Sequence, residues 1–250
     1  MNRLSVIIPL YNRAAFIGQA LKSLLDQSDA CDLSIIVVND GSTDDGPEIV
    51  EKLMVSHPSI SMISTPNQGV TKARNVGLAA VPADAEFFSF LDSDDISPPG
   101  RFSADLAEFD SNPDIQFTYG RMTLTDQLGD DGEPTPGART VTVRGVSLCA
   151  GLYRRNLIDS VGNFDESLEQ SEDTDYLLRL FESGVQHVLT QTICVYYRRH
   201  EGNMTVNSKV AMRNFMLAIK KSLARRKANP AVAMPENLFD FNALIEMRNG

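Results

Sequence analysis

The chain has 250 residues, of which 42% are hydrophobic and 22% charged, and its formal net charge is −10. This length suits one large α/β domain, or one domain with a small appendage. An acidic chain lacks the cationic face that a general nucleic-acid binder needs, so we expect no nucleic-acid partner. Cys31, Cys149 and Cys194 are odd in number and far apart, which indicates neither a disulfide framework nor a metal knuckle. We interpret them as free, buried thiols.

No stretch approaches the ~20 apolar residues that cross a bilayer. The first ten residues contain a short apolar run without a signal-peptide cleavage site, and we interpret this run as a core strand. The expectation is a cytoplasmic protein.

The first part of the chain alternates short, β-branched apolar runs with segments whose apolar residues recur at helical spacing. Strands are predicted at residues 4–8, 33–38, 60–63 and 87–91, and helices at 16–24, 45–54 and 70–80, with Asn12 available as a cap for the first helix. This alternation predicts an α/β fold: a Rossmann-like, mainly parallel sheet sandwiched by helices.

The second part is less regular. Helices are predicted at residues 101–110, 154–161 and 173–183, strands at 115–122 and 185–198, and a mobile surface loop at 126–139, which is rich in Gly, Pro and Asp.

Residues 209–227 form a basic segment with seven Lys/Arg and no Asp/Glu, so the rest of the chain carries −17 against −10 for the whole. Its apolar residues recur at helical spacing: Met212, Phe215, Met216, Ile219 and Leu223. Two interpretations remain open. This apolar stripe packs on the domain, or the helix makes a peripheral contact with an anionic membrane at its inner face, or with a partner helix in a homodimer.

In open α/β sheets, ligands bind beyond the carboxyl ends of the strands. Polar residues follow each of the first four predicted strands, and we expect them to meet along one edge. They are Pro9, Tyr11 and Asn12; Asn39, Asp40 and Ser42; Asn67 and Gly69; and Asp92, Ser93, Asp94 and Asp95.

The acidic run Asp92-Ser93-Asp94-Asp95 follows an apolar strand. Its carboxylates repel one another, and a bound Mn²⁺ or Mg²⁺ would relieve the repulsion, since these ions prefer oxygen ligands. Such an ion could bridge to a diphosphate. The alternative is a solvated acidic turn that caps the next helix.

Four further side chains each have a binding and a structural interpretation. Asp40 could accept the imide N–H of uracil, or stabilise its own turn. Arg74 could pair with phosphate, or be an exposed helical cation. Asp173, beside Glu172 and near Asp175, could be a general base, or complement a helix dipole. His200 could bind a metal or diphosphate, or be structural.

Together these residues resemble the family-2 glycosyltransferases, which have the GT-A fold. The ordered motifs span residues 4 to about 204. They are Ser5–Asn12, Val37–Asp44, Asn67–Gly69 with Ala73–Asn75, Leu91–Asp95, Val161–Asp165, Glu172–Asp173 and Tyr197–His200.

The resemblance implies a role for each matched position. Asp94 would ligate the metal directly, with Asp92 and His200 near it, and Asp95 would be only a helix cap. Asp173 would be the catalytic base, oriented by Glu172. The remaining donor-binding set would be Pro9, Tyr11, Asn12, Asp40, Arg74, Asp92 and Ser93.

The resemblance also implies an inverting transfer of sugar from a nucleotide-sugar, with UDP favoured, to a hydroxyl of a glycan or lipid-linked acceptor. Bacterial polysaccharide, lipopolysaccharide or glycolipid synthesis is the expected setting. Residues 1–208 would form the GT-A domain, with a nucleotide-binding half at 1–100 and an acceptor half at 101–208. Residues 209–250 would form a helical tail. The alternatives are a non-catalytic nucleotide-sugar-binding subunit and a nucleotidyltransferase.

Overall fold

The computed structural model describes residues 1–203, 208–230, 234–235 and 238–240. These residues form one sheet in the order β3-β2-β1-β4-β7-β5-β6, with β8 paired to β5. The strands are β1 (Arg3–Leu10), β2 (Asp32–Asp40), β3 (Ile60–Thr65), β4 (Phe87–Phe90), β5 (Phe117–Thr125), β6 (Thr140–Val143), β7 (Gly151–Arg154) and β8 (His187–Arg198). The helices are α1 (Ala14–Leu25), α2 (Gly46–Ser56), α3 (Val70–Ala80), α4 (Arg101–Ser111), η1 (Leu148–Ala150), α5 (Leu157–Val161), α6 (Glu172–Glu182) and α7 (Ser208–Ala228).

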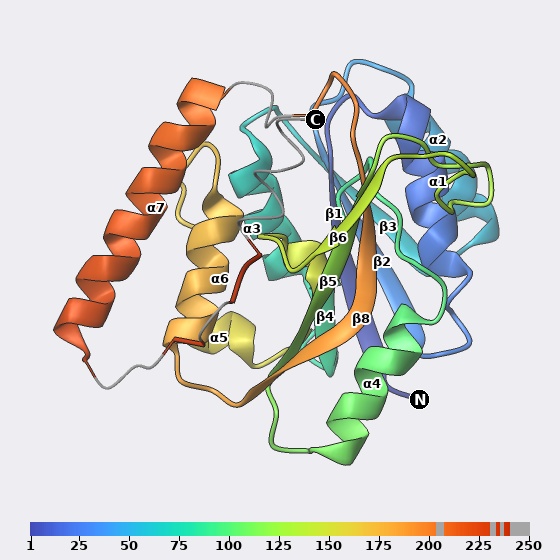
Figure 1. The fold of residues 1–250 in the computed structure, drawn as a ribbon. Helices are drawn as coiled ribbons and strands as arrows, with labels where there is room; N and C mark the ends of the chain where they lie inside the picture. The colour runs from blue at the N-terminus through green and yellow to red at the C-terminus, as the bar shows by residue number, and fades with distance from the viewer. Residues whose placement is uncertain (204–207, 231–233, 236–237, 241–250) are drawn as a thin grey trace.

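The four N-terminal strands are parallel, as predicted. β1 lies between β2 and β4, and β2 also pairs with β3. The side chains of β1 from Leu4 to Ile8 are buried, because helices cover both faces of the sheet (Figure 1). In this register Leu10 lies opposite Asn39, and Asp40 opposite Thr65, so the carboxyl ends of three strands share one edge.

Helices lie on both sides of the sheet, which confirms the predicted α/β sandwich. In Figure 1, α1 and α2 lie on one side, and α3, α5 and α6 lie on the other. α3 packs closely on β1 at Gly77, where an added Cβ would lie 2.3 Å from Cγ2 of Ile7. This contact allows α3 to approach the sheet and brings Arg74, one turn earlier, to its ligand edge.

The second half of the sheet differs in part from the prediction. β5 and β8 were expected, and they pair in parallel. β6 and β7 were not predicted, because each has only four residues, too few for an alternating pattern to stand out from the surrounding loops. β7 pairs antiparallel with both β4 and β5, so Arg154 belongs to a strand, and the helix predicted from residue 154 begins at Leu157. Residues 126–139 lie outside helices and strands, as predicted, and their mobility stays a prediction.

The basic segment forms a helix, α7, which packs on α6. Ala218 and Ser222 are buried at this contact. The apolar stripe predicted to pack on the domain is instead largely exposed, with exposed fractions of 55% for Met212, 58% for Met216 and 55% for Leu223. The helix therefore packs on the domain as predicted, and the prediction is wrong for these three of the five stripe residues, whereas Phe215 and Ile219 are partly buried.

Among the described residues, the predicted helical tail ends at Ala228. The described residues 234–235 and 238–240 are not helical. Leu238 is buried in the core, and the carboxylate of Asp240 accepts the backbone N–H of Arg144 at 2.8 Å. Residues 231–233, 236–237 and 241–250 of that prediction lie outside the described residues. Within the described part of the chain, no helix is long and apolar enough to cross a bilayer.

The close packing at Gly77 generates a stability prediction. Gly77→Ala should lower the free energy of unfolding by about 1–3 kcal/mol, since the new methyl group overlaps Ile7. Gly18→Ala is the matched control: Gly18 also lies in a helix, but its nearest atom would be 3.8 Å away. That variant should gain about 0.5–1 kcal/mol from helix propensity. Urea denaturation measures both, and a stabilised Gly77→Ala would contradict the packing.

Candidate active site

A buried arginine connects the two halves of the candidate site. Arg74, on α3, donates from Nη2 to Oδ1 of Asp92 at 2.7 Å and from Nη1 to Oε1 of Glu172. Asp92 follows β4, and Glu172 begins α6. Arg74 is 5% exposed, so the interpretation of an exposed helical cation is wrong. The acidic run and the first turn of α6, both predicted as site segments, are thus ion-paired to one side chain.

The side chains of Asp94 and His200, both predicted as metal ligands, lie next to each other. Nε2 of His200 lies 3.1 Å from Oδ2 of Asp94, and the same oxygen accepts Nε of Arg13 at 2.8 Å. The His200 ring lies against Phe16, with ring centroids 4.6 Å apart. Through His200, the segment after β8 therefore contacts both the acidic run and α1.

Asp95 is not the helix cap that was expected. It is 1% exposed, α4 begins only after Gly100, and Oδ1 of Asp95 accepts the backbone N–H of Arg198 at 3.0 Å. Its Oδ2 has no hydrogen-bond partner among the described residues. Burial, together with the nearby charges of Asp94 and Asp92, raises the pKa of Asp95 well above its ordinary value.

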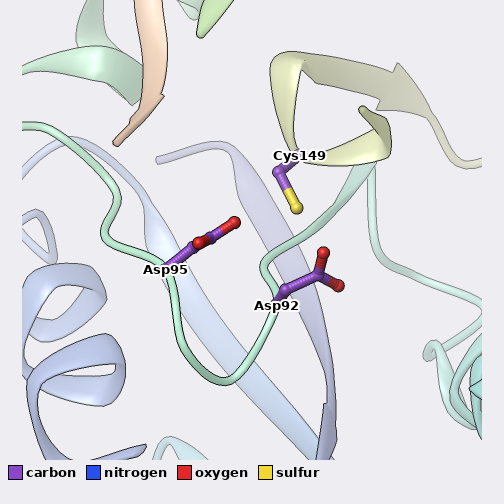
Figure 2. Close-up of side chains that lie close together, drawn as sticks. All are labelled: Asp92, Asp95 and Cys149. Atoms are coloured by element: carbon purple, nitrogen blue, oxygen red, sulfur yellow. The ribbon is translucent and has the colours of Figure 1, made fainter. Parts of the chain in front are cut away.

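Cys149 joins this acidic site, and sequence reasoning missed it. One ligand atom each from Asp92, Asp95 and Cys149 lies within 4.8 Å of the others. Figure 2 shows the sulfur beside the loop that carries both aspartates. Burial raises the pKa of the Cys149 thiol well above its ordinary value. The free, buried state predicted for all three cysteines is confirmed. No local signal could have placed Cys149 here, because the pairing of β7 with β4 brings it in.

The two candidate catalytic carboxylates lie at the N-terminus of α6. Burial raises the pKa of Glu172 to about 7 against the opposing charge of Arg74, and burial likewise raises the pKa of Asp173. Asp173 is partly buried and accepts the backbone N–H of Thr174 at 2.6 Å. Asp175 instead pairs with Arg179 and Arg225, so it stabilises the helix contacts. A carboxyl group with a raised pKa can act as a general base near neutral pH.

The residues expected around the nucleotide base include two that stabilise loops. Oδ1 and Oδ2 of Asp40 accept the backbone N–H groups of Gln68 and Gly69, both at 2.8 Å. Asp40 therefore stabilises the loop that precedes α3, and its own turn is held by Asn39, whose Oδ1 accepts the backbone N–H of Ser42 at 2.9 Å. The interpretation that Asp40 stabilises its own turn is wrong, and its contact with uracil stays a prediction. Oδ1 of Asn12 accepts the N–H of Thr43 at 2.8 Å, so Asn12 does not cap α1.

Three further predicted donor-binding residues lie at or near the same edge. Tyr11 is 45% exposed directly after β1, and Pro9 is partly buried within that strand. Ser93 is buried between the flanking aspartates of the acidic run. The structure brings these residues to the expected edge, and their contacts with a donor stay predictions.

Comparison with known proteins agrees with this geometry. Residues 5–159 match the family model described as "Glycosyl transferase family 2". The chain belongs to glycosyl transferase family 2.

Two curated relatives illustrate what this family-2 chain is similar to. It is 27% identical over 90% of its length to a chondroitin synthase of Pasteurella multocida, of which it covers 24%. It is 27% identical over 79% of its length to the minor teichoic acid biosynthesis protein GgaA of Bacillus subtilis, of which it covers 47%. The chain therefore spans from about a quarter to about a half of the length of these relatives.

Two solved structures confirm the GT-A fold. The first is S. aureus TarS 1-349 in complex with UDP-GlcNAc, with a TM-score of 0.71 and 24% identity over 89% of this chain and 66% of that one. The second is the mannosyltransferase PcManGT of Pyrobaculum calidifontis in complex with GDP-Man and Mn²⁺. Its TM-score is 0.62, with 16% identity over 99% of this chain and 79% of that one.

The side chains of this family-2 chain fit a divalent cation. The carboxylates of Asp92 and Asp94 and the imidazole of His200 are suitable ligands for Mn²⁺ or Mg²⁺. The 3.1 Å between Oδ2 of Asp94 and Nε2 of His200 places two of these donor atoms together. Asp95, whose Oδ2 has no hydrogen-bond partner among the described residues, offers a further ligand atom within 4.8 Å of one from Asp92.

The buried ion pairs of Arg74 predict a large stability effect. Arg74→Met should lower the free energy of unfolding by about 3–5 kcal/mol, because it leaves Asp92 and Glu172 without their cation. Lys22→Met is the matched control at the exposed pair with Asp26, and should cost less than about 0.5 kcal/mol. Equal losses in both variants, measured by denaturation, would contradict the assigned ion pairs.

The raised pKa of Glu172 predicts a pH-dependent stability. Its pKa rises from an ordinary value of 4.5 to about 7 on folding, so the folded state binds more protons in this range. Stability should therefore fall as pH rises through this window, by roughly 1–3 kcal/mol from this group.

The Glu172→Gln variant should lack this component, and the exposed Glu169→Gln serves as its control. Denaturant unfolding at a series of pH values measures the effect. Identical pH profiles for wild type and Glu172→Gln would show that Glu172 does not titrate there.

Proposed function

We propose that this protein is an inverting glycosyltransferase that moves a sugar from a UDP-sugar to a hydroxyl acceptor with the help of Mn²⁺ or Mg²⁺. The observation that supports it best is the ion-paired connection through Arg74. It brings the acidic run after β4, suited to a cation and a diphosphate, beside the carboxylates of α6, suited to proton removal.

The proposed reaction is a single displacement. Asp173 accepts the proton of the acceptor hydroxyl, and the hydroxyl oxygen forms a bond to the anomeric carbon. The bond from that carbon to the phosphate oxygen breaks, and the electron pair leaves with the nucleoside diphosphate. The configuration inverts because attack and departure occur on opposite faces of the sugar.

Each residue contributes to positioning or charge. Glu172 is held by Arg74 at the start of α6, which fixes the adjacent Asp173. Asp92, Asp94 and His200 would hold the cation, which when bound neutralises the diphosphate. Positioning and stabilisation of the leaving group are what an oxocarbenium-like transition state needs most.

The donor and acceptor are proposed by chemical class. UDP is favoured by the resemblance-based role of Asp40, and a UDP-sugar is bound in the TarS structure. The names of the relatives, a chondroitin synthase and a teichoic acid biosynthesis protein, support a glycan or lipid-linked acceptor in bacterial polysaccharide, lipopolysaccharide or glycolipid synthesis. The cytoplasmic location stays a prediction.

The alternatives of a non-catalytic sugar-nucleotide subunit and of a nucleotidyltransferase gain no specific support. The partly buried carboxyl of Asp173, whose pKa burial raises, favours the catalytic interpretation over a subunit that only binds nucleotide-sugars.

Turnover of a panel of UDP-sugars and GDP-sugars with Mn²⁺ tests the proposal. Asp173→Asn should lower kcat by about 10²–10⁴-fold, since it removes the general base, while leaving UDP affinity unchanged. The exposed Asp29→Asn is the control and should behave as wild type. Release of UDP at the wild-type rate by Asp173→Asn would refute the assigned base. UDP binding without turnover of any donor, with every acceptor class tried, would favour the subunit.

A further inference from the structure

α7 has two faces of different character, and only one of them contacts the domain. The inward face carries the small, buried Ala218 and Ser222. Ion pairs also hold this face to the domain: Lys221 pairs with Asp165, and Arg225 pairs with both Asp175 and Glu182. The inward cations are therefore neutralised by the acceptor half of the domain.

The outward face of α7 is apolar along its centre. Met212, Met216 and Leu223 are each more than half exposed. Their spacings of four and seven residues place them in one stripe along the helix. Figure 1 shows α7 at the outer edge of the molecule, beside α6 and away from the sheet. An exposed row of large apolar side chains on one side of a helix is a candidate binding surface.

Cations accompany this stripe. Arg213, Lys220 and Lys227 are exposed, and none of them forms an ion pair with another described residue. By helical spacing they lie on the same outward side as Met216. We call the six residues Arg213, Met212, Met216, Lys220, Leu223 and Lys227 the outward face.

The charge of this face favours an anionic lipid surface over a second copy of the chain as its binding partner. An exposed apolar stripe with adjacent unpaired cations matches an anionic lipid surface, where apolar side chains enter the headgroup boundary and lysines contact phosphates. A second copy docked through the same face would bring these cations against one another. The chain outside residues 209–227 carries −17, against −10 for the whole, so α7 is the surface that an anionic bilayer would attract.

We propose that the outward face of α7 docks this protein on an anionic lipid bilayer. The helix would lie in the plane of the surface, still fastened to α6 by its inward ion pairs. This proposal does not depend on the proposed reaction, because lipid binding is measured without donor or turnover. It deepens the proposed function in one respect: α6, which carries Glu172 and Asp173, would lie one helix away from the lipid.

Co-sedimentation of the full chain with vesicles tests the proposal. The vesicles contain phosphatidylcholine alone, or phosphatidylcholine with phosphatidylglycerol. Wild type should bind only the anionic vesicles, and more weakly at high salt. Replacing the three outward cations by Gln should lower the partition coefficient at least about tenfold. Replacing Met212, Met216 and Leu223 together by Ser should lower it by a similar factor.

A charge-matched variant controls for net charge. Arg3, Lys22 and Lys52 are exposed cations in the nucleotide-binding half, and their joint replacement by Gln changes the net charge equally. This variant should bind anionic vesicles as wild type does. Circular dichroism checks that every variant keeps its helices, as expected for substitutions at exposed positions.

Three outcomes would overturn the proposal. The first is failure of wild type to sediment with anionic vesicles, and the second is a loss of binding by the charge-matched control as large as that of the outward-cation variant. The third is a dimer in sedimentation velocity without lipid that the Ser variant dissociates, combined with absent vesicle binding. That result would assign the outward face to a second copy of the chain.

Discussion

The structure of the site depends on the buried guanidinium of Arg74. A charge of this kind is stable in the interior only where carboxylates surround it, because the cost of desolvation is otherwise too high. Arg74 meets Asp92 from the end of β4 and Glu172 from the start of α6. These segments belong to the two halves of the chain, so one side chain sets the distance between the segment suited to a diphosphate and the segment suited to an acceptor.

The remaining carboxylates of the acidic run follow the same logic. Asp94 pairs with Arg13 from the start of α1 and with His200 after β8, while Asp95 accepts a backbone N–H from Arg198. Each aspartate thus contacts a different element, which explains how three acidic residues in four positions coexist in a folded core. Glu172, with a pKa raised to about 7, and Asp173, whose pKa burial also raises, then share the field of Arg74. Burial raises both pKa values against the opposing charge of Arg74.

The helices and strands with a strong local pattern could be predicted from the sequence, and so could the polar loops that follow these strands at the edge of the sheet. β1, β2 and α3 were predictable because long apolar runs and helical spacing recur there, and the edge that gathers Asp40, Asp92 and Asp94 follows from parallel pairing. The strands β6 and β7 have only four residues each and were missed, and with β7 the contact of Cys149 with Asp92 and Asp95 was missed too. The contacts of individual side chains could not be predicted from the sequence either. Arg74 was expected at a phosphate and lies between two carboxylates, and the outward direction of Met212 and Met216 is set by ion pairs on the opposite face of α7.

The central claim is that the acidic run after β4 binds a nucleoside diphosphate through a divalent cation. Calorimetric titration of UDP into the protein, with Mn²⁺ and with a chelator, measures this directly. The account predicts that Mn²⁺ raises UDP affinity in wild type by at least about tenfold, and that Asp94→Asn abolishes this gain without unfolding the protein. Equal UDP affinity with Mn²⁺ and with chelator, in wild type and in Asp94→Asn alike, would contradict it.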